Sequence, residues 1–108
     1  MERRWTTRTR LCVDVDIANA DGGVLRCTTQ DIGLGGVYVA VPRAQLSEGQ
    51  NVELTFRLAQ SVTTEEHKLR ARVVRTNHGG AGLMFRDFDA NAFRSLQRVM
   101  RARDSAVV

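Results

Sequence analysis

The stretch Asn51-Val-Glu-Leu-Thr-Phe-Arg-Leu58 decides the fold, because polar and apolar residues alternate through all of its positions. Alternation with a period of two is typical of a β-strand that has one face on a hydrophobic core and the other toward solvent. The same period recurs on both sides of this stretch. The sequence therefore predicts a mainly β protein built from short strands.

Further segments carry the same alternation. Their limits are Leu11–Ile17, Val24–Gln30, Val37–Val41, His67–Thr76 and Ala81–Phe85. The stretches Asn19-Ala-Asp-Gly-Gly23 and Asn77-His-Gly-Gly80 are typical of tight hairpin turns, since asparagine and glycine tolerate left-handed conformations. Six short antiparallel strands predict a closed β-barrel, because closure removes exposed sheet edges.

The period changes after the last predicted strand. Asp89 is a suitable helix N-cap, and an apolar stripe at helical spacing follows it, with arginines around it. The stripe comprises Phe93, Leu96, Gln97, Val99 and Met100. We expect this C-terminal α-helix to cap one opening of the barrel. Between the strands, Ala44–Glu48 predicts one helical turn, and the polar stretch Gln60–Glu66 predicts an exposed loop.

Length and composition fit one globular domain. The chain has 108 residues, 43% hydrophobic and 26% charged, which is enough for a single modest core. No apolar run approaches the roughly 20 residues that cross a bilayer, and no signal-peptide core is present, so we expect a cytoplasmic protein without a membrane span. The net charge is +4, and arginine supplies fifteen of sixteen basic residues, which favours an anionic partner.

The first ten residues hold four arginines, Arg3, Arg4, Arg8 and Arg10, against a single acid. A planar guanidinium suits phosphate oxygens and guanine edges. A solvated terminal tail without a ligand can have the same composition. The rest of the chain must therefore decide whether these arginines bind a ligand or are simply solvated. We treat residues 1–10 as a flexible arm and residues 11–108 as the barrel with its helix, within one domain overall.

A second motif, Asp31-Ile-Gly-Leu-Gly-Gly36, places three glycines in four positions between two predicted strands. We expect the backbone there to adopt positive φ or to approach another group closely. Neither the lysine nor the helix that follows a Walker or Rossmann phosphate loop is present. The motif is therefore not a phosphate loop of those kinds.

Patterns typical of enzymes and metal sites are missing from the sequence. The serines and histidines form no Ser-His-acid arrangement, and an outward-facing strand explains the pair Asp14 and Asp16. Cys12 and Cys27 lie in different predicted strands without zinc-site spacing, so we expect two buried or half-buried free thiols. The sequence predicts a binding module rather than an enzyme, with no metal and no cofactor.

The two motifs in series resemble those of PilZ domains. Arg4-Trp-Thr-Thr-Arg8 is similar to the RxxxR element of that family, and Asp31–Gly36 is similar to its [D/N]xSxxG element, in the same order and spacing. The resemblance covers nearly the whole chain, including Gly82-Leu-Met-Phe85 before the helix. It implies a six-stranded antiparallel PilZ-type β-barrel with a C-terminal α-helix and a flexible N-terminal arm.

PilZ domains are bacterial receptors for the second messenger cyclic di-GMP, so the resemblance implies this ligand. It also implies that Arg4 and Arg8 grip phosphates and guanine edges, that Asp31 accepts hydrogen bonds from a guanine, and that Gly36 permits close approach of ligand and backbone. Gly33 replaces the family serine. The loss of one hydrogen bond, worth about 0.5 to 1.5 kcal/mol, weakens binding without abolishing it.

The residues around the two arginines of the motif carry further expectations. Arg3 precedes the RxxxR element, and the resemblance implies that an arginine there favours an intercalated pair of nucleotides, for which Arg3 or Arg10 supplies charge. Trp5 either stacks on a guanine or anchors the arm on the barrel. Three outward arginines of one predicted strand either border the site or are simply solvated: Arg70, Arg72 and Arg75.

A receptor module must also contact a protein effector, and the basic face of the helix and the Gln60–Glu66 loop are the two candidate surfaces. Two other functions stay open. One is a PilZ-like adaptor without nucleotide binding, with which Gly33 is consistent. The other is a small barrel for single-stranded nucleic acid, but such surfaces interleave aromatic residues, and here Trp5 and Tyr38 are the only polar-edged ones. We therefore expect cyclic di-GMP rather than nucleic acid.

Overall fold

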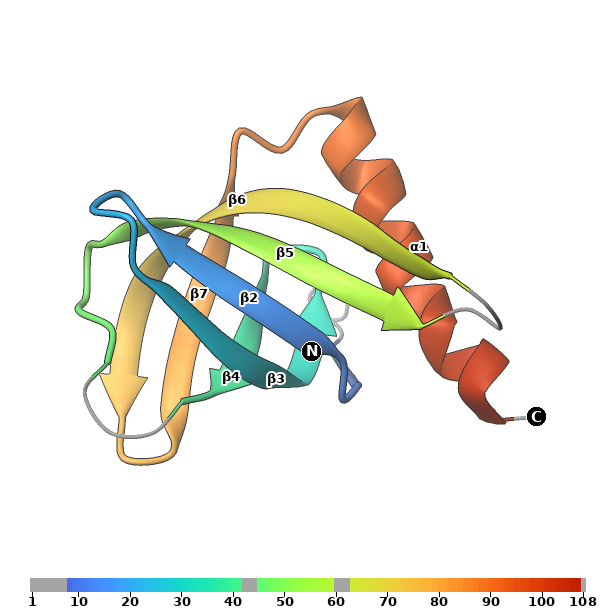
Figure 1. Ribbon diagram of the computed structural model, residues 1–108, viewed down its shortest axis with the longest axis horizontal. Helices are drawn as coiled ribbons and strands as arrows, with labels where there is room; N and C mark the ends of the chain where they lie inside the picture. Colours follow the sequence, from blue (N-terminus) through green and yellow to red (C-terminus); the bar gives the residue numbers. More distant parts are fainter. Residues whose placement is uncertain (1–7, 42–44, 60–62, 108) are drawn as a thin grey trace, which may run out of the picture.

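The computed structural model describes residues 8–41, 45–59 and 63–107, which form seven strands and one helix. These are β1 Arg8–Arg10, β2 Asp14–Asn19, β3 Val24–Gly33, β4 Gly36–Ala40, β5 Asn51–Ala59, β6 Thr64–Asn77, β7 Gly80–Arg86 and α1 Ala90–Val107. All strand pairs are antiparallel in the order β1-β3-β2-β5-β6-β7-β4, and β4 pairs back onto β3. Strands β2 to β7 therefore close the predicted six-stranded barrel (Figure 1), and β1 is added to it by pairing with β3.

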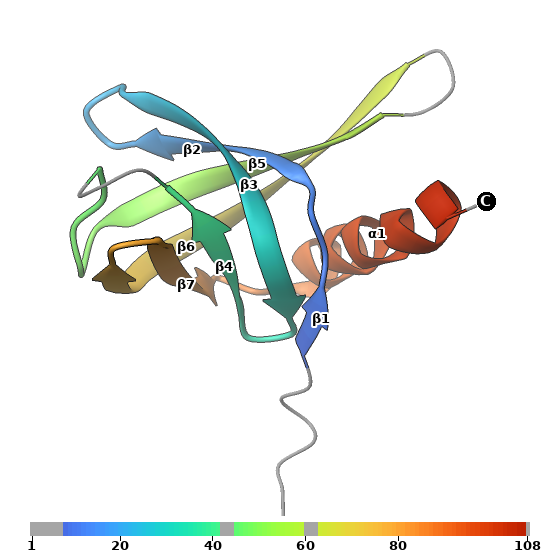
Figure 2. The same ribbon diagram turned by 90° about the horizontal axis from the view of Figure 1, so that it is seen from below.

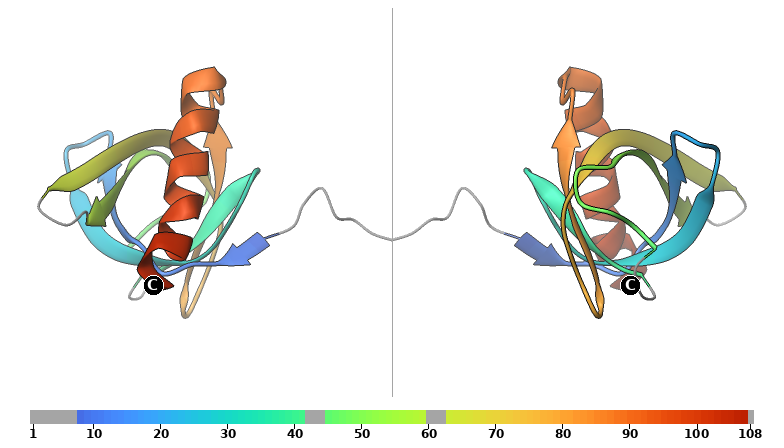
Figure 3. Two further views of the ribbon diagram at one scale, coloured as in Figure 1. Left: turned by 90° about the vertical axis from the view of Figure 1, so that its right-hand side faces the viewer. Right: turned by 90° about the vertical axis from the view of Figure 1, so that its left-hand side faces the viewer.

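The core is made by the inward-facing residues of the strands. In β5 every second residue from Val52 to Leu58 is buried, and the residues between them are exposed or half-buried. Leu96 and Val99 of α1 are fully buried in the same apolar cluster. The helix contacts β6 and β5 and lies across one end of the barrel, so it caps that opening as predicted (Figure 3).

The start of α1 follows the sequence prediction, and its apolar stripe is narrower than predicted. The carboxylate of Asp89 accepts a hydrogen bond from the N–H of Ala92 at 2.9 Å, which caps the helix. Phe93 is 39% exposed and Gln97 is exposed. Phe93 instead packs edge-on against Phe88, with ring centroids 6.2 Å apart.

Two predicted connections are wrong. Residues 45–50 form a bend and a turn, with Gly49 at φ 88°, rather than a helical turn, and Ala44 lies outside the described residues. The predicted Gln60–Glu66 loop is too long, because β6 already begins at Thr64. The first apolar residue buried in β6 is Leu69, so the strand's opening residues carry no apolar alternation that could reveal them.

The predicted strand Leu11–Ile17 is interrupted. Residues 24–28 of β3 pair with β2, and residues 31–33 pair with β1 along the same edge (Figure 2). Between these two pairings the chain leaves the regular ladder, and the buried hydroxyl of Thr29 fills the gap. This hydroxyl donates a hydrogen bond to the carbonyl of Leu11 and accepts one from the N–H of Val13 at 2.9 Å. Through these two hydrogen bonds, Thr29 of β3 holds the segment that connects β1 to β2.

We expect Thr29→Val to lower the free energy of unfolding by about 1–3 kcal/mol, measured by urea denaturation. Valine keeps the shape of threonine but leaves the buried N–H of Val13 and the carbonyl of Leu11 without this partner. Thr28→Val is the matched control, since Thr28 is half-buried and its hydroxyl makes no hydrogen bond within the described part of the chain. An equal loss in both variants would contradict the role of Thr29.

Candidate functional site

Strand β1 brings the end of the arginine motif, defined as Arg4–Arg8, beside the Asp31 motif, defined as Asp31–Gly36. Arg8 lies opposite Gly33, and Arg10 lies opposite Asp31. Directly opposed residues of an antiparallel pair, such as Arg10 and Asp31, have Cβ atoms about 4.5–5.5 Å apart. Two segments that are far apart in the sequence therefore meet at one edge of β3 (Figure 2).

A cavity of about 720 Å³ opens beside this pairing. Its walls come from β3, from Leu11 and Cys12 in the segment that connects β1 to β2, and from Ala40 at the end of β4. Arg10 and Asp31 both line it, so it carries a cation and a carboxylate on neighbouring strands. Its volume lies in the range that holds small-molecule ligands.

The profile of the PilZ domain family matches residues 2–102, which is nearly the whole chain. This chain belongs to the PilZ domain family. No curated protein sequence matches it. Solved structures do, and they share the fold of this PilZ domain.

Three solved structures illustrate the similarity. The PilZ domain of CeSA from a cellulose-synthesizing bacterium is 27% identical, with a TM-score of 0.75 over 91% of this chain and 99% of that one. The PilZ domain of YcgR from Escherichia coli, solved with c-di-GMP, is 18% identical, with a TM-score of 0.77 over 97% and 95%. The inhibitor of motility MotI/DgrA from Bacillus subtilis is 22% identical, with a TM-score of 0.71, and this chain spans 53% of its length.

The structure places only part of the predicted site. Arg3, Arg4 and Trp5 lie outside the described residues, so their roles stay predictions. Residues 8–10, which were predicted to belong to the arm, form β1 and pair with β3. Within β1 the structure brings Arg8 and Arg10 opposite the second motif, which is the juxtaposition that a shared ligand site requires.

The glycines of the Asp31 motif do not have the predicted positive φ, which the described residues show for glycine only at Gly22 and Gly49. Gly36 instead allows a close approach of two strands. A Cβ placed on Gly36 would lie 2.1 Å from the carbonyl oxygen of Leu83 in β7. Gly36 thus makes a close approach to the barrel itself, and its close approach to a ligand stays a prediction. Gly33 is buried and is the last residue of β3, so the strand includes only the first three residues of the motif.

The cysteines and paired acids of this PilZ domain have structural surroundings. Burial, and secondarily the charge of Asp16, raises the pKa of Cys27. Cys12 is exposed rather than buried, because it lies between Leu11 and Val13, which take the buried positions of this stretch. Asp16 pairs with Arg57 at 3.2 Å, which supports the interpretation of the Asp14 and Asp16 pair as an outward strand face.

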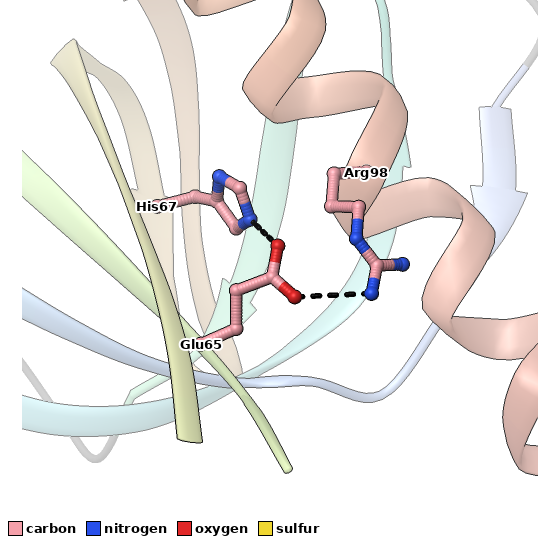
Figure 4. A network of polar contacts seen from close by, with 3 residues as sticks. All are labelled: Glu65, His67 and Arg98. Carbon is pink, nitrogen blue, oxygen red and sulfur yellow. Dashed lines mark hydrogen bonds and ion pairs between the residues drawn. The ribbon is translucent and has the colours of Figure 1, made fainter. Parts of the chain in front are cut away.

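A second polar cluster joins the barrel to the helix (Figure 4). Glu65 of β6 contacts Nε2 of His67 at 2.5 Å through one carboxylate oxygen and Nη2 of Arg98 at 3.0 Å through the other. The hydrogen bond with His67 is the main cause of the lowered pKa of Glu65. Burial raises this pKa, and the contact with Arg98 lowers it further. Glu65, which was predicted to belong to the effector loop, therefore contacts Arg98 on the basic face of the helix.

We expect acid to weaken this link. Because its pKa is lowered in the folded state, Glu65 contributes stability that is fully present above its ordinary pKa of 4.5 and is lost as the pH falls through the lower folded value. The melting temperature of Glu65→Gln should therefore fall less than that of the parent chain between about pH 6 and about pH 3. Glu66→Gln, at an exposed neighbouring position, should keep the pH dependence of the parent chain. If the melting temperatures of Glu65→Gln and of the parent fell equally with pH, the contacts of Glu65 would not contribute to stability.

Proposed function

We propose that this PilZ domain is a receptor for cyclic di-GMP and that the ligand binds between the arginine motif and the Asp31 motif. The observation that carries the proposal is the pairing of β1 with β3, which sets Arg8 opposite Gly33 and Arg10 opposite Asp31. A ligand held by one motif is then within reach of the other. Family membership supports the choice of ligand, as does the similar fold of the YcgR domain solved with c-di-GMP.

Each residue type suits its part of this ligand. The guanidiniums of Arg4 and Arg8 can each donate two hydrogen bonds, either to phosphate oxygens or to O6 and N7 of guanine. The carboxylate of Asp31 can accept from N1–H and N2–H of a guanine. Arg3 and Arg10 add positive charge that a pair of nucleotides would need. Trp5 either stacks on a base or anchors the arm.

Gly33 sets the strength of binding rather than the identity of the ligand. It stands opposite Arg8 without the hydroxyl of the family serine. One missing hydrogen bond of about 0.5 to 1.5 kcal/mol corresponds to a several-fold weaker affinity. Gly36 contributes chiefly by letting β4 and β7 approach, which fixes the shape of the face on which the ligand would lie.

The receptor would act inside a bacterial cell through a protein effector. Among the described residues there is no helix with the length and apolarity needed to span a bilayer. Folding of the arginine arm over the nucleotide would change the surface next to β1 and β3. That change is the signal that a protein partner in the cytoplasm would read.

We expect cyclic di-GMP to bind at micromolar or better affinity in isothermal titration calorimetry. Arg4→Ala and Arg8→Ala should each weaken binding by about 10- to 100-fold, since each removes hydrogen bonds to charged groups. Arg94→Ala is the control, because Arg94 is exposed on α1 and bonds only Asn91 among the described residues. The absence of binding to the parent chain would favour the adaptor function, and tighter binding of single-stranded DNA would favour the nucleic-acid function.

A further inference from the structure

A row of side-chain positions crosses the outer face of the barrel from β3 to β6. Asp31 lies opposite Tyr38 in β4, Tyr38 lies opposite Gly82 in β7, and Gly82 lies opposite Arg75 in β6. Opposed residues of antiparallel strands point to the same face, and the residues on either side of Tyr38 are fully buried, so this row faces outward. It continues the proposed nucleotide site beyond its two motifs.

Two glycines of β7 leave room for the large side chains of this row. A Cβ on Gly80 would lie 2.0 Å from the carbonyl oxygen of Val39 and 3.1 Å from Cε2 of Tyr38, and a Cβ on Gly82 would lie 3.1 Å from Nε of Arg75. Tyr38 and Arg75 therefore lie along the surface of β7. The Tyr38 hydroxyl donates a hydrogen bond to Oδ1 of Asn77 at 2.6 Å, which fixes the ring on the β6–β7 turn.

The charge of Arg75 has no counter-charge within the described residues. Some other arginines of the barrel form ion pairs there, such as Arg57 with Asp16 and Arg70 with Asp87, whereas Arg72 of the same strand, like Arg75, forms none among the described residues. Arg75 contacts a ring instead, with its Cζ 5.9 Å from the centroid of Tyr38, inside the range of a cation–π interaction. An exposed guanidinium that is held in place but not neutralised is suited to bind an acceptor group of a ligand.

We propose that Arg75, held by Tyr38, binds the second nucleotide when a pair of cyclic di-GMP molecules occupies the site. The inference rests on the proposed function and adds a residue that neither motif contains. The contact is a pair of hydrogen bonds from the guanidinium to the guanine edge or the phosphate of that nucleotide. Asp31 and Arg75 then contact different nucleotides from opposite ends of the row.

The span of the row fits a pair better than a single molecule. The Arg75 side chain crosses Gly82 toward Tyr38, which places its guanidinium about two strand spacings, roughly 10 Å, from Asp31. Stacked bases lie about 3.4 Å apart. Two intercalated cyclic di-GMP molecules stack four guanines, whose outer planes are therefore also about 10 Å apart. One end of such a stack lies at Asp31 and the other at Arg75.

Calorimetric titration of the full chain with cyclic di-GMP tests this assignment. The parent chain should bind two nucleotides per chain. Arg75→Gln should retain the first and lose the second, or weaken the second by about tenfold or more. Arg72→Gln is the matched control, because it removes the same charge from another exposed arginine of β6. Arg72 lies opposite Met84, whereas Arg75 lies opposite Gly82. The Arg72→Gln chain should bind two.

Gly82→Ala separates the position of the guanidinium from its charge. The added methyl group would lie 3.1 Å from Nε of Arg75 and would push this side chain off the surface of β7 by a small distance while every charge is kept, so the second nucleotide should again bind more weakly. One nucleotide per parent chain, or equal binding by Arg75→Gln and Arg72→Gln, would overturn the inference and leave the receptor function standing. A parent chain that binds no cyclic di-GMP would overturn the receptor function as well.

Discussion

The pairing of β1 with β3 is the interaction on which the proposed site depends. One edge of β3 carries β2 and then β1, and the hydroxyl of Thr29 bridges the change between them. Because side chains alternate along a strand, a register shift of one residue would set Arg10 opposite Ile32, whose side chain is in the core. The observed register sets Arg10 opposite Asp31 instead, and so turns two sequence motifs into one surface.

Local pattern was enough to predict the barrel and its cap. The alternation in β5, the glycine turns and the N-cap at Asp89 each depend on a few neighbouring residues, and each was confirmed. Prediction failed where the cause lies elsewhere in the chain. The interruption at residues 11–13 depends on Thr29, which is distant in sequence, and the start of β6 at Thr64 has no buried face that could mark it.

The candidate site was predictable to a similar degree. The two motifs could be found from residue types and spacing, but the sequence offered no means of distinguishing Arg75 from the other outward arginines of its strand. Its setting depends on cross-strand register, which aligns it with Gly82 and Tyr38, and on the bare surface of β7. The contact of Gly36 with β7 was also not predictable, because its place in a ligand motif does not reveal that the same glycine allows two strands to pack closely.

Joint binding of cyclic di-GMP by the arginine motif and the outer face of β3 and β4 is tested most directly by amide chemical shifts recorded during a titration. The largest shifts should occur at Thr9, Arg10, Asp31 and Tyr38, because these residues belong to β1, to β3, which pairs with β1, and to β4, which pairs with β3. The amides of β5 should change little. Shifts confined to β5 and α1, or no shifts at all at saturating ligand, would contradict this site.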